Sequence, residues 1–351
     1  MTDVKILYIT RKYPPMIGGM ESMSAALAKE FSQLVSTTLI TWGRSQKYLP
    51  IFIPFAFIKA CFFIPKKGIT HIHIGDALLS PLGLLLKILF NVKTSINIAG
   101  LDIIFTFPGY QWIIPKCVAK FDLIICISQA TREECIQRGI PEQKCVIIPC
   151  GIYPKKWESN ATKKDLEEII QANITDKKIF ITVGRLVERK GVAWFIQNVF
   201  NKLKNNSVYL IIGEGPERER IQELITRFHL EHDVFLLGKI LDETLKIIYS
   251  TADAFIMPNI QVQGTMEGFG IVAIEASSTG LPVIASDCEG IRDAIISGKT
   301  GTLVIPKDRN TYLQLLNHLP ITNRQSVKKE TIQKYSWDAI GKEYIHQFRK
   351  L

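Results

Sequence analysis

The chain has 351 residues, of which 47% are hydrophobic and 22% charged, a balance that excludes disordered and fibrous proteins and leaves enough apolar material for two cores. The formal net charge is +10, and a net +7 lies between Leu39 and Lys120, where nine Lys or Arg residues face two acids. Such a local positive field favours an anionic partner. Phosphate and an acidic membrane fit it; nucleic acid fits poorly, because no nucleic-acid-binding motif accompanies the charge.

The seven cysteines form no C-x-x-C pair of the zinc or redox type, and some of them, such as Cys126, lie in apolar runs where a thiol acts as a small hydrophobe. The apolar run at the N-terminus has the length of a strand and lacks the layout of a signal peptide. We therefore expect reduced thiols and a cytoplasmic location.

Strand-like and helical segments alternate along the first 150 residues. Residues 4–10 are expected to form a strand, and a loop with Gly18 and Gly19 leads from it to an amphipathic helix at 21–33. Further strands are expected at 37–41, 71–74, 94–98, 123–127 and 146–148. His71 and His73 alternate on one of these strands, which indicates packing in preference to a metal site.

The most apolar stretch covers residues 49–65. Pro50, Pro54 and Lys59 interrupt it, and its unbroken part is expected to be too short to cross a bilayer. Twelve of the 33 aromatic residues lie between Leu39 and Lys120, together with the positive charge. Two interpretations stay open: a buried crossover helix at 52–63, or a surface that attaches the protein peripherally to the inner face of an anionic membrane.

A polar break at residues 149–161 separates this part from a second alternating series. Its strands are expected at 179–183, 209–212, 234–237, 254–257, 282–285 and 301–304. Alternation of this kind predicts two doubly wound α/β domains, which we place at residues 1–153 and 154–334. Ligands in such folds lie at the carboxyl ends of the strands, so we expect the site in a cleft between the domains.

A segment with two glutamates, Glu267 and Glu275, carries the strongest chemical pattern. Seven residues separate the two carboxylates, and residues 269–277 are expected to form a helix that ends at Gly280. The glycines leave the N–H groups at the helix start open, and such a terminus attracts phosphate. The alternative is a solvated glutamate in a surface loop.

Two further loops suit an anionic ligand. Gly184 ends a strand, and Arg185 and Lys190 follow it with a spacing of five residues, so that Arg185 can bind phosphate bidentately and Lys190 adds a point charge. The adjacent Gly18 and Gly19 allow a ligand to approach the backbone closely, although a plain turn would look the same.

Together these segments resemble the retaining glycosyltransferases of family 4, which have the GT-B architecture of two Rossmann-like domains that face a central cleft. The resemblance is densest from Phe180 to Asp308, and the N-terminal part matches loosely. It includes Gly213-Glu-Gly-Pro216, Leu237-Gly238-Lys239, Ala252-Asp253-Ala254, Pro258, the two-glutamate segment, Gly280-Leu-Pro-Val283, Glu289-Gly290-Ile291 and Gly298-Lys-Thr-Gly301. Ser336-Trp337 and the closing segment, residues 335–351, resemble the family's last helix, which returns to the N-terminal domain.

The resemblance implies a role for each candidate residue. Arg185 and Lys190 would hold the donor diphosphate, Glu267 would contact the donor sugar, and Glu275 would bind the ribose hydroxyls. The remaining donor-binding positions are Gly18, Gly19, Gly184, Lys239, Ile240, Gly268, Phe269, Gly270, Ile271 and Val272. No metal or other cofactor is expected, because the two cations and the helix terminus would neutralise the leaving diphosphate.

One position departs from the family. Many members have a histidine where this chain has Ala99, directly before Gly100, and that histidine supports the sugar at the reaction centre. As a whole, the resemblance implies transfer of a hexose from a UDP- or GDP-sugar to an acceptor. The acceptor would be lipid-linked or a carbohydrate, in the assembly of a surface polysaccharide or glycolipid. A sugar-nucleotide epimerase of the same fold and an inactive binding module stay open as alternatives.

Overall fold

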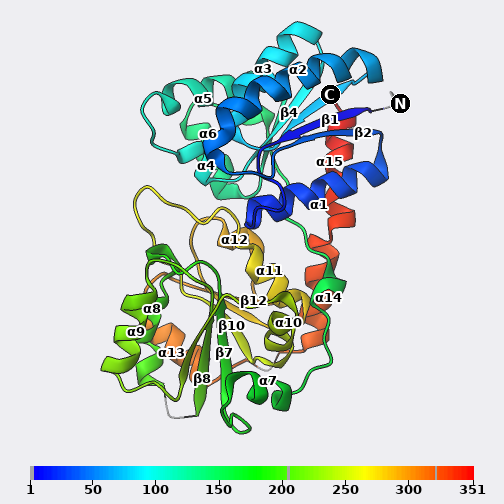
Figure 1. Cartoon of the computed structure of the whole chain (residues 1–351). Coiled ribbons are helices and arrows are strands. Elements are labelled where there is room, and N and C mark those ends of the chain that lie inside the picture. The colour runs from blue at the N-terminus through cyan, green and yellow to red at the C-terminus, as the bar shows by residue number, and fades with distance from the viewer. Residues whose placement is uncertain (1–3, 204–205, 321) are drawn as a thin grey trace. The chain divides into compact units, whose positions relative to one another are not determined.

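The computed structural model describes residues 4–203, 206–320 and 322–351, which form two compact units (Figure 1). The first unit consists of Met1–Gly151, Met266–Phe269 and Trp337–Leu351. The second consists of Ile152–Thr265 and Gly270–Ser336. The short segment Met266–Phe269 thus belongs with the first unit, although its chain neighbours belong to the second.

A six-stranded sheet in the order β2-β1-β3-β4-β5-β6 forms the centre of the first unit. Its strands are β1 (Ile6–Thr10), β2 (Thr37–Thr41), β3 (His71–Ile74), β4 (Lys93–Ile98), β5 (Leu123–Cys126) and β6 (Cys145–Ile147), and all neighbours pair in parallel. Its helices are α1 (Gly19–Leu34), α2 (Leu49–Lys67), α3 (Ser80–Phe90), α4 (Leu101–Ile104), α5 (Tyr110–Val118), α6 (Gln129–Gln137) and α15 (Trp337–Arg349), with short 3₁₀ turns η1 (Gln46–Tyr48), η2 (Ala77–Leu79) and η3 (Glu142–Lys144).

Helices cover both faces of this sheet, because successive strand residues point to opposite sides. Leu7 and Ile9 of β1 join a core with side chains of α2, α3 and α5. Tyr8, between them in sequence, points the other way and meets Phe31 of α1 edge-on at 5.8 Å. Helix α15 packs against α1 on that second face.

Helix α2 corrects one of the expectations from sequence. The prolines do not interrupt it: the helix runs unbroken over 19 residues with Pro54 and Pro65 inside it. Pro50 stands in the first turn, where the backbone N–H has no helical partner, and an internal proline removes only one hydrogen bond while the rest of the helix continues.

The second unit has its own parallel sheet of six strands, in the order β12-β11-β10-β7-β8-β9. The strands are β7 (Lys178–Val183), β8 (Ser207–Ile212), β9 (Val234–Gly238), β10 (Ala254–Met257), β11 (Val283–Ser286) and β12 (Gly301–Val304). The helices are α7 (Lys163–Ile170), α8 (Val192–Asn198), α9 (Arg218–Arg227), α10 (Asp242–Thr251), α11 (Ile271–Ser278), α12 (Ile291–Ala294), α13 (Arg309–Asn317) and α14 (Arg324–Tyr335), with short turns η4 (Pro154–Trp157), η5 (Glu188–Lys190) and η6 (Phe200–Lys202).

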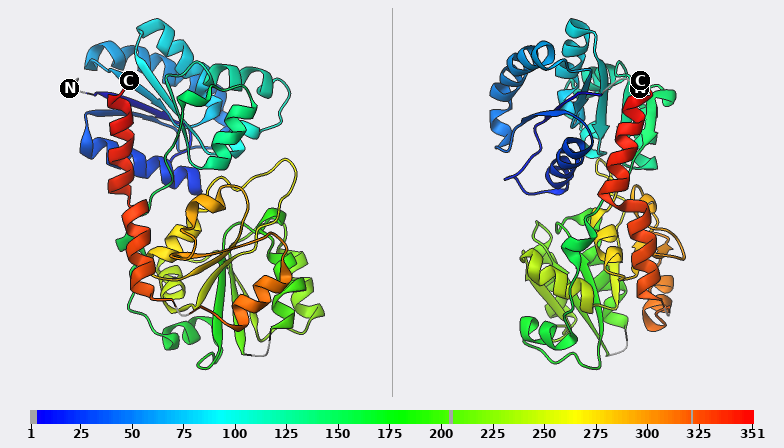
Figure 2. Two further views of the ribbon diagram at one scale, coloured as in Figure 1. Left: turned by 180° about the vertical axis from the view of Figure 1, so that it is seen from behind. Right: turned by 90° about the vertical axis from the view of Figure 1, so that its right-hand side faces the viewer.

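The two faces of the second sheet are again covered separately. Phe180 and Tyr209 pack into a core with side chains of α8, α9 and α13, and Phe255 points to the face where Tyr249 of α10 lies. Figure 2 shows the helices on either side of each sheet. The predicted fold class, two doubly wound α/β units with parallel sheets, is confirmed.

Candidate active site

The loops that follow β7, β8 and β9 are joined by backbone hydrogen bonds at the carboxyl edge of the second sheet. The N–H of Gly184 donates to the carbonyl of Ile212 at 2.9 Å, and the N–H of Gly213 donates to the carbonyl of Gly238 at 2.8 Å. Gly213 has φ 136°, and a Cβ there would lie 1.9 Å from the carbonyl oxygen of Gly184. Only glycine allows this approach, so the backbone at this edge forms a closely packed surface on which a ligand can bind.

The side chain of Lys190 lies against Gly184 at this surface. The residue ends the turn η5, is only 8% exposed, and its Cε and Nζ would lie 3.4 and 3.6 Å from a Cβ on Gly184. The next residue, Gly191, has φ 68° and packs so closely on Pro258 that a Cβ would lie 1.9 Å from its carbonyl oxygen. Because Lys190 is largely removed from water, an anion beside it would gain more electrostatic energy than at an exposed lysine. Arg185, at the start of the same loop, is exposed.

Helix α11 begins at the same edge of the sheet. It follows β10, the direct neighbour of β7 in the sheet, and the contact between Gly191 and Pro258 joins the two loops. Gly270 precedes the helix with φ 87° and no side chain caps it, so the N–H groups of Ile271 and Val272 have no acceptor within the helix. A buried lysine and an uncapped helix start therefore lie at the same edge of the sheet, after neighbouring strands, an arrangement suited to phosphate.

Glu275 projects from α11 and is half-buried. The hydroxyl of Tyr249 donates a hydrogen bond to its Oε2 at 3.3 Å. Burial raises the pKa of Glu275 to about 7, and the nearby positive charge of Lys156 acts in the opposite direction. The carboxyl group therefore changes its protonation state near neutral pH, and it can accept hydrogen bonds from hydroxyl groups when it is ionised.

We expect donor binding to depend on the ionisation of Glu275. Ribose hydroxyls that donate to the carboxylate would lower its pKa from about 7, so affinity for a nucleoside-diphosphate sugar should rise as pH increases through 7 and then level off. The donor is a diester of diphosphate and has no proton that titrates near neutral pH. A change in the calorimetric binding constant over this pH range therefore reports the titration of a group in the protein. In Glu275→Gln the rise should vanish; an unchanged pH dependence in that variant would contradict the ribose assignment.

The first glutamate of the segment lies in the other unit. Glu267 is half-buried, and next to it a Cβ on Gly268 would lie 2.2 Å from the carbonyl oxygen of Ala99. Gly100 has φ 101° and lies against Met266, whose Sδ would be 2.9 Å from a Cβ there. The turn at Ala99 and the start of the two-glutamate segment are therefore packed together within the first unit. The role predicted for Glu267, contact with the donor sugar, stays a prediction.

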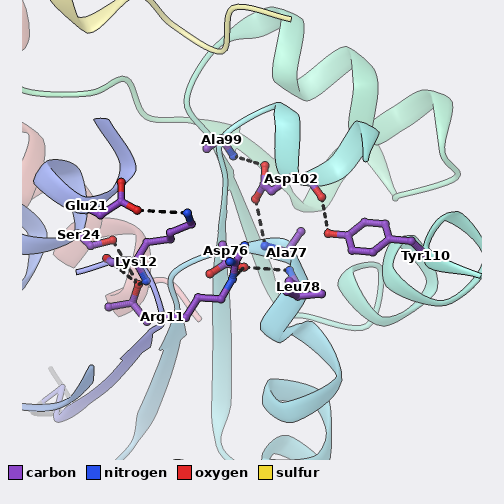
Figure 3. Close-up of polar contacts among 11 residues, drawn as sticks. Arg11, Lys12, Glu21, Ser24, Asp76, Ala77, Leu78, Ala99, Asp102 and Tyr110 are labelled. Carbon is purple, nitrogen blue, oxygen red and sulfur yellow. Dashed lines mark hydrogen bonds and ion pairs between the residues drawn. The ribbon is translucent and has the colours of Figure 1, made fainter. Parts of the chain in front are cut away.

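A polar network supports that turn (Figure 3). The carboxylate of Asp102 accepts hydrogen bonds from the backbone N–H of Ala99 at 2.9 Å and from that of Ala77 at 3.0 Å. These two bonds connect the loop after β4 to the loop after β3. Burial raises the pKa of Asp102 to about 6. Buried Asp76 accepts Arg11 Nε at 2.9 Å. None of these acids or Arg11 was predicted as a site residue; Arg11 and Asp76 lie within two residues of the ends of β1 and β3, which was the available indication.

The Gly-Gly loop lies at the start of α1. The ammonium of Lys12 pairs with Glu21 at 3.2 Å, and the Glu21 carboxylate folds over Gly18, where a Cβ would meet its Oε2 at 2.3 Å. For Gly19 no described atom lies within 4 Å of a Cβ. The fold itself gives no reason for glycine at position 19, and close approach of a ligand would give one.

Gly19→Ala is expected to separate stability from activity. Alanine favours a helix over glycine by about 0.5–1 kcal/mol, so the melting temperature should stay equal or rise. The added methyl group should lower kcat/KM for the donor at least about tenfold, because it occupies the approach to the backbone. Ser22→Ala, one position on the exposed side of the same helix, is the control. Normal kinetics of Gly19→Ala would remove this loop from the site.

The remaining candidates lie in the loop after β9 and in the segment before α11. Lys239 is exposed and Ile240 half-buried in the loop after β9, and Phe269 is buried in the first unit. Among the described residues no group of three or more His, Cys, Asp or Glu side chains could hold a metal ion; metal independence stays a prediction. His71 and His73 are buried, share Ser95 Oγ at 2.7 Å each, and burial lowers the pKa of His71 to about 3, in agreement with packing.

Comparison with known proteins decides the family. The pattern of the glycosyl transferases group 1 matches residues 163–331, and that of glycosyltransferase family 4 matches residues 49–156. The chain belongs to the family 4, group 1 glycosyltransferases. The resemblance identified from the sequence is confirmed, and the two matches together cover most of both units.

Among this glycosyltransferase's relatives is an uncharacterised glycosyltransferase of Methanocaldococcus jannaschii, 30% identical over 239 residues, which are 64% of this chain and 59% of the relative. Another is the UDP-Gal:α-D-GlcNAc-diphosphoundecaprenol α-1,3-galactosyltransferase of Escherichia coli, 27% identical over 216 residues, 59% of this chain and 53% of the relative. The chain thus spans little more than half the length of these two relatives.

Solved structures support the fold. HepE of Anabaena, solved in complex with UDP, superimposes with a TM-score of 0.80 and 18% identity over 99% of this chain and 100% of that chain. At this identity the likeness concerns the fold alone, which is that of the GT-B glycosyltransferases.

Proposed function

We propose that this family member is a retaining, metal-independent hexosyltransferase that uses a UDP- or GDP-sugar. The observation that carries the proposal is the placement of buried Lys190 and the uncapped start of α11 on loops that follow the neighbouring strands β7 and β10. Glu275, half-buried on α11, supplies a carboxylate for the ribose, and Tyr249 fixes its orientation.

In the proposed mechanism the acceptor hydroxyl attacks the anomeric carbon on the face that the diphosphate leaves. The bond from the anomeric carbon to the phosphate oxygen breaks, the bond to the acceptor oxygen forms, and the acceptor proton passes to the departing diphosphate. Arg185 and Lys190 stabilise the negative charge that develops on this leaving group. No side chain is needed as general base, and the histidine that Ala99 replaces is expected to support the sugar, so its absence removes no group that carries the proton.

Relatives support the choice of substrates. The Escherichia coli relative is named for UDP-galactose and a diphosphoundecaprenol-linked acceptor, and HepE was also solved with UDP-glucose. We propose a lipid-linked or carbohydrate acceptor in polysaccharide or glycolipid assembly. Ala99 favours one second candidate, a module that binds the donor without turnover.

A thermal-shift screen against UDP-, GDP- and ADP-sugars tests the donor proposal. A ligand at 100 times its Kd stabilises the folded state by about 2.7 kcal/mol, which raises the melting temperature of a domain of this size by roughly 5–10 °C. A UDP- or GDP-sugar should do so, and Glu275→Gln should reduce the shift. No shift with any donor would contradict the proposal, and formation of an epimer without acceptor would indicate an isomerase.

A further inference from the structure

Helix α2 has two apolar faces. One face, formed by Phe52, Ala56, Ala60 and Ile64, is buried in the core of the first unit. The opposite side carries Ile51, Phe55, Ile58 and Phe62, spaced by four, three and four residues, with side chains between 41% and 68% exposed. This spacing places the four on one stripe of the helix, so a continuous apolar stripe faces solvent.

The exposed apolar surface is concentrated in the first unit, in and after this helix. Among the described residues 19 large hydrophobic side chains are exposed, and 14 of them lie between Tyr48 and Ile113. In the described part of the second unit only Leu241 and Ile305 are exposed in this way. Helix α3, which packs beside α2 along the same face of the sheet (Figures 1 and 2), adds Leu85, Ile88 and Leu89. An apolar patch of this kind marks an interaction surface.

Lysines border the stripe in a repeated arrangement. Lys59 Nζ lies 4.6 Å from the ring centre of Phe55, and Lys66 Nζ lies 4.7 Å from that of Phe62. In α5 the ammonium of Lys116 lies 4.6 Å from the ring centre of exposed Trp112. Helix α2 contains no acid. Aromatic rings flanked by lysines suit the boundary between acyl chains and anionic headgroups, where long cationic side chains reach the phosphates.

We propose that the exposed stripe of α2, together with α3, binds the surface of an anionic lipid bilayer and lies in its plane. By length and composition α2 could cross a membrane, with a mean hydropathy of 1.6 over its most apolar 18-residue window. It cannot do so in this fold, because it joins β2 to β3 of one sheet and buries its other face in the core. This attachment does not depend on the proposed transfer reaction.

The other occupant to consider is a second copy of the chain. A symmetric contact through the α2 stripe would bring Lys59 and Lys66 of both copies together, with no acid on either helix to offset them. Like charges placed together oppose association. An anionic bilayer has headgroups whose negative charge complements the lysines, and acyl chains into which the apolar stripe can insert.

Vesicle flotation tests the proposal. The whole chain should float with phosphatidylglycerol-containing vesicles at low salt, bind far less to pure phosphatidylcholine vesicles, and be released by high salt. Lys59→Glu with Lys66→Glu should lower the partition coefficient at least about 30-fold, since each lysine contributes about fivefold. Ile58→Ser with Phe62→Ser should lower it at least about tenfold by removing inserted apolar area.

Controls separate attachment from folding and from function. Leu241→Ser with Ile305→Ser removes exposed apolar side chains from the second unit and should leave vesicle binding unchanged. The α2 variants should keep the wild-type melting temperature and donor-induced thermal shift, since their side chains are exposed. Failure of the wild type to float with anionic vesicles at low salt, or a dimer in solution that Ile58→Ser with Phe62→Ser abolishes, would overturn the proposal.

Discussion

Lys190→Ala is expected to lower kcat for sugar transfer by about 10²–10³-fold, the usual cost of losing one preorganised group that stabilises charge in the transition state. Lys190 is buried above the turn at Gly184, so the cation is held in place before the diphosphate charge develops. Lys190→Met keeps the length of the aliphatic stem and should lose the same factor, which shows that charge, not packing, is responsible. Arg185→Ala should give a loss of similar size from the opposite end of the loop.

The control for these variants is Lys177→Ala. Lys177 directly precedes β7, at the amino edge of the sheet and opposite to the carboxyl edge, and pairs with Asp233 at 2.5 Å, so its loss should leave kcat unchanged. Steady-state kinetics with the donor found by the thermal-shift screen, with melting temperatures measured in parallel, supply the comparison. A folded Lys190→Met variant that turns over at the wild-type rate would refute the assignment of Lys190.

Gly191→Ala is expected to destabilise the second unit by about 3 kcal/mol. The residue has φ 68°, which costs a side chain about 1–2 kcal/mol, and its Cβ would lie 1.9 Å from the carbonyl oxygen of Pro258, which forces the backbone to move. The melting temperature of that unit should fall by roughly 6–12 °C. This contact holds the loop of Lys190 against the loop that leads to α11.

A matched control isolates the clash from the backbone strain. Gly298 has nearly the same conformation, φ 74°, but no described atom lies within 4 Å of a Cβ. Gly298→Ala should therefore cost only the conformational part, about half the loss or less. Equal melting temperatures for the two variants would show that the Gly191–Pro258 contact does not support the fold.

Much of the fold could be predicted from hydrophobic patterning. The strands β2, β3, β10 and β12 begin and end at the predicted residues. For the fully buried β3 and β10, a short apolar run defines the strand; β2 and β12 are edge strands and only partly buried. Helix α2 could not be predicted as continuous, since composition does not show that a helix tolerates prolines at positions that lose few hydrogen bonds. Of the two interpretations of its apolar residues, the buried helix holds for one face, while the other face is exposed and membrane attachment stays a proposal.

The candidate site was predicted where local motifs carry the chemistry. Lys190 and the start of α11 follow strands that are far apart in sequence, and only the strand order places them together. The support of Ala99 by Asp102, and that of Glu275 by Tyr249, depends on side chains brought together by the fold. Periodicity and spacing carry no information on such contacts, and the raised pKa of Glu275 follows from burial that they do not show.

The anomeric configuration of the product tests the central claim most directly. The protein would be incubated with the α-linked UDP- or GDP-sugar that stabilises it and with a panel of carbohydrate and polyprenyl-diphosphate-linked acceptors, and the anomeric proton of the product would be followed by NMR. The proposed mechanism predicts an α-linked product, formed at a rate that falls about 10²–10³-fold in Lys190→Met. A β-linked product, or tight donor binding without transfer to any acceptor, would contradict it.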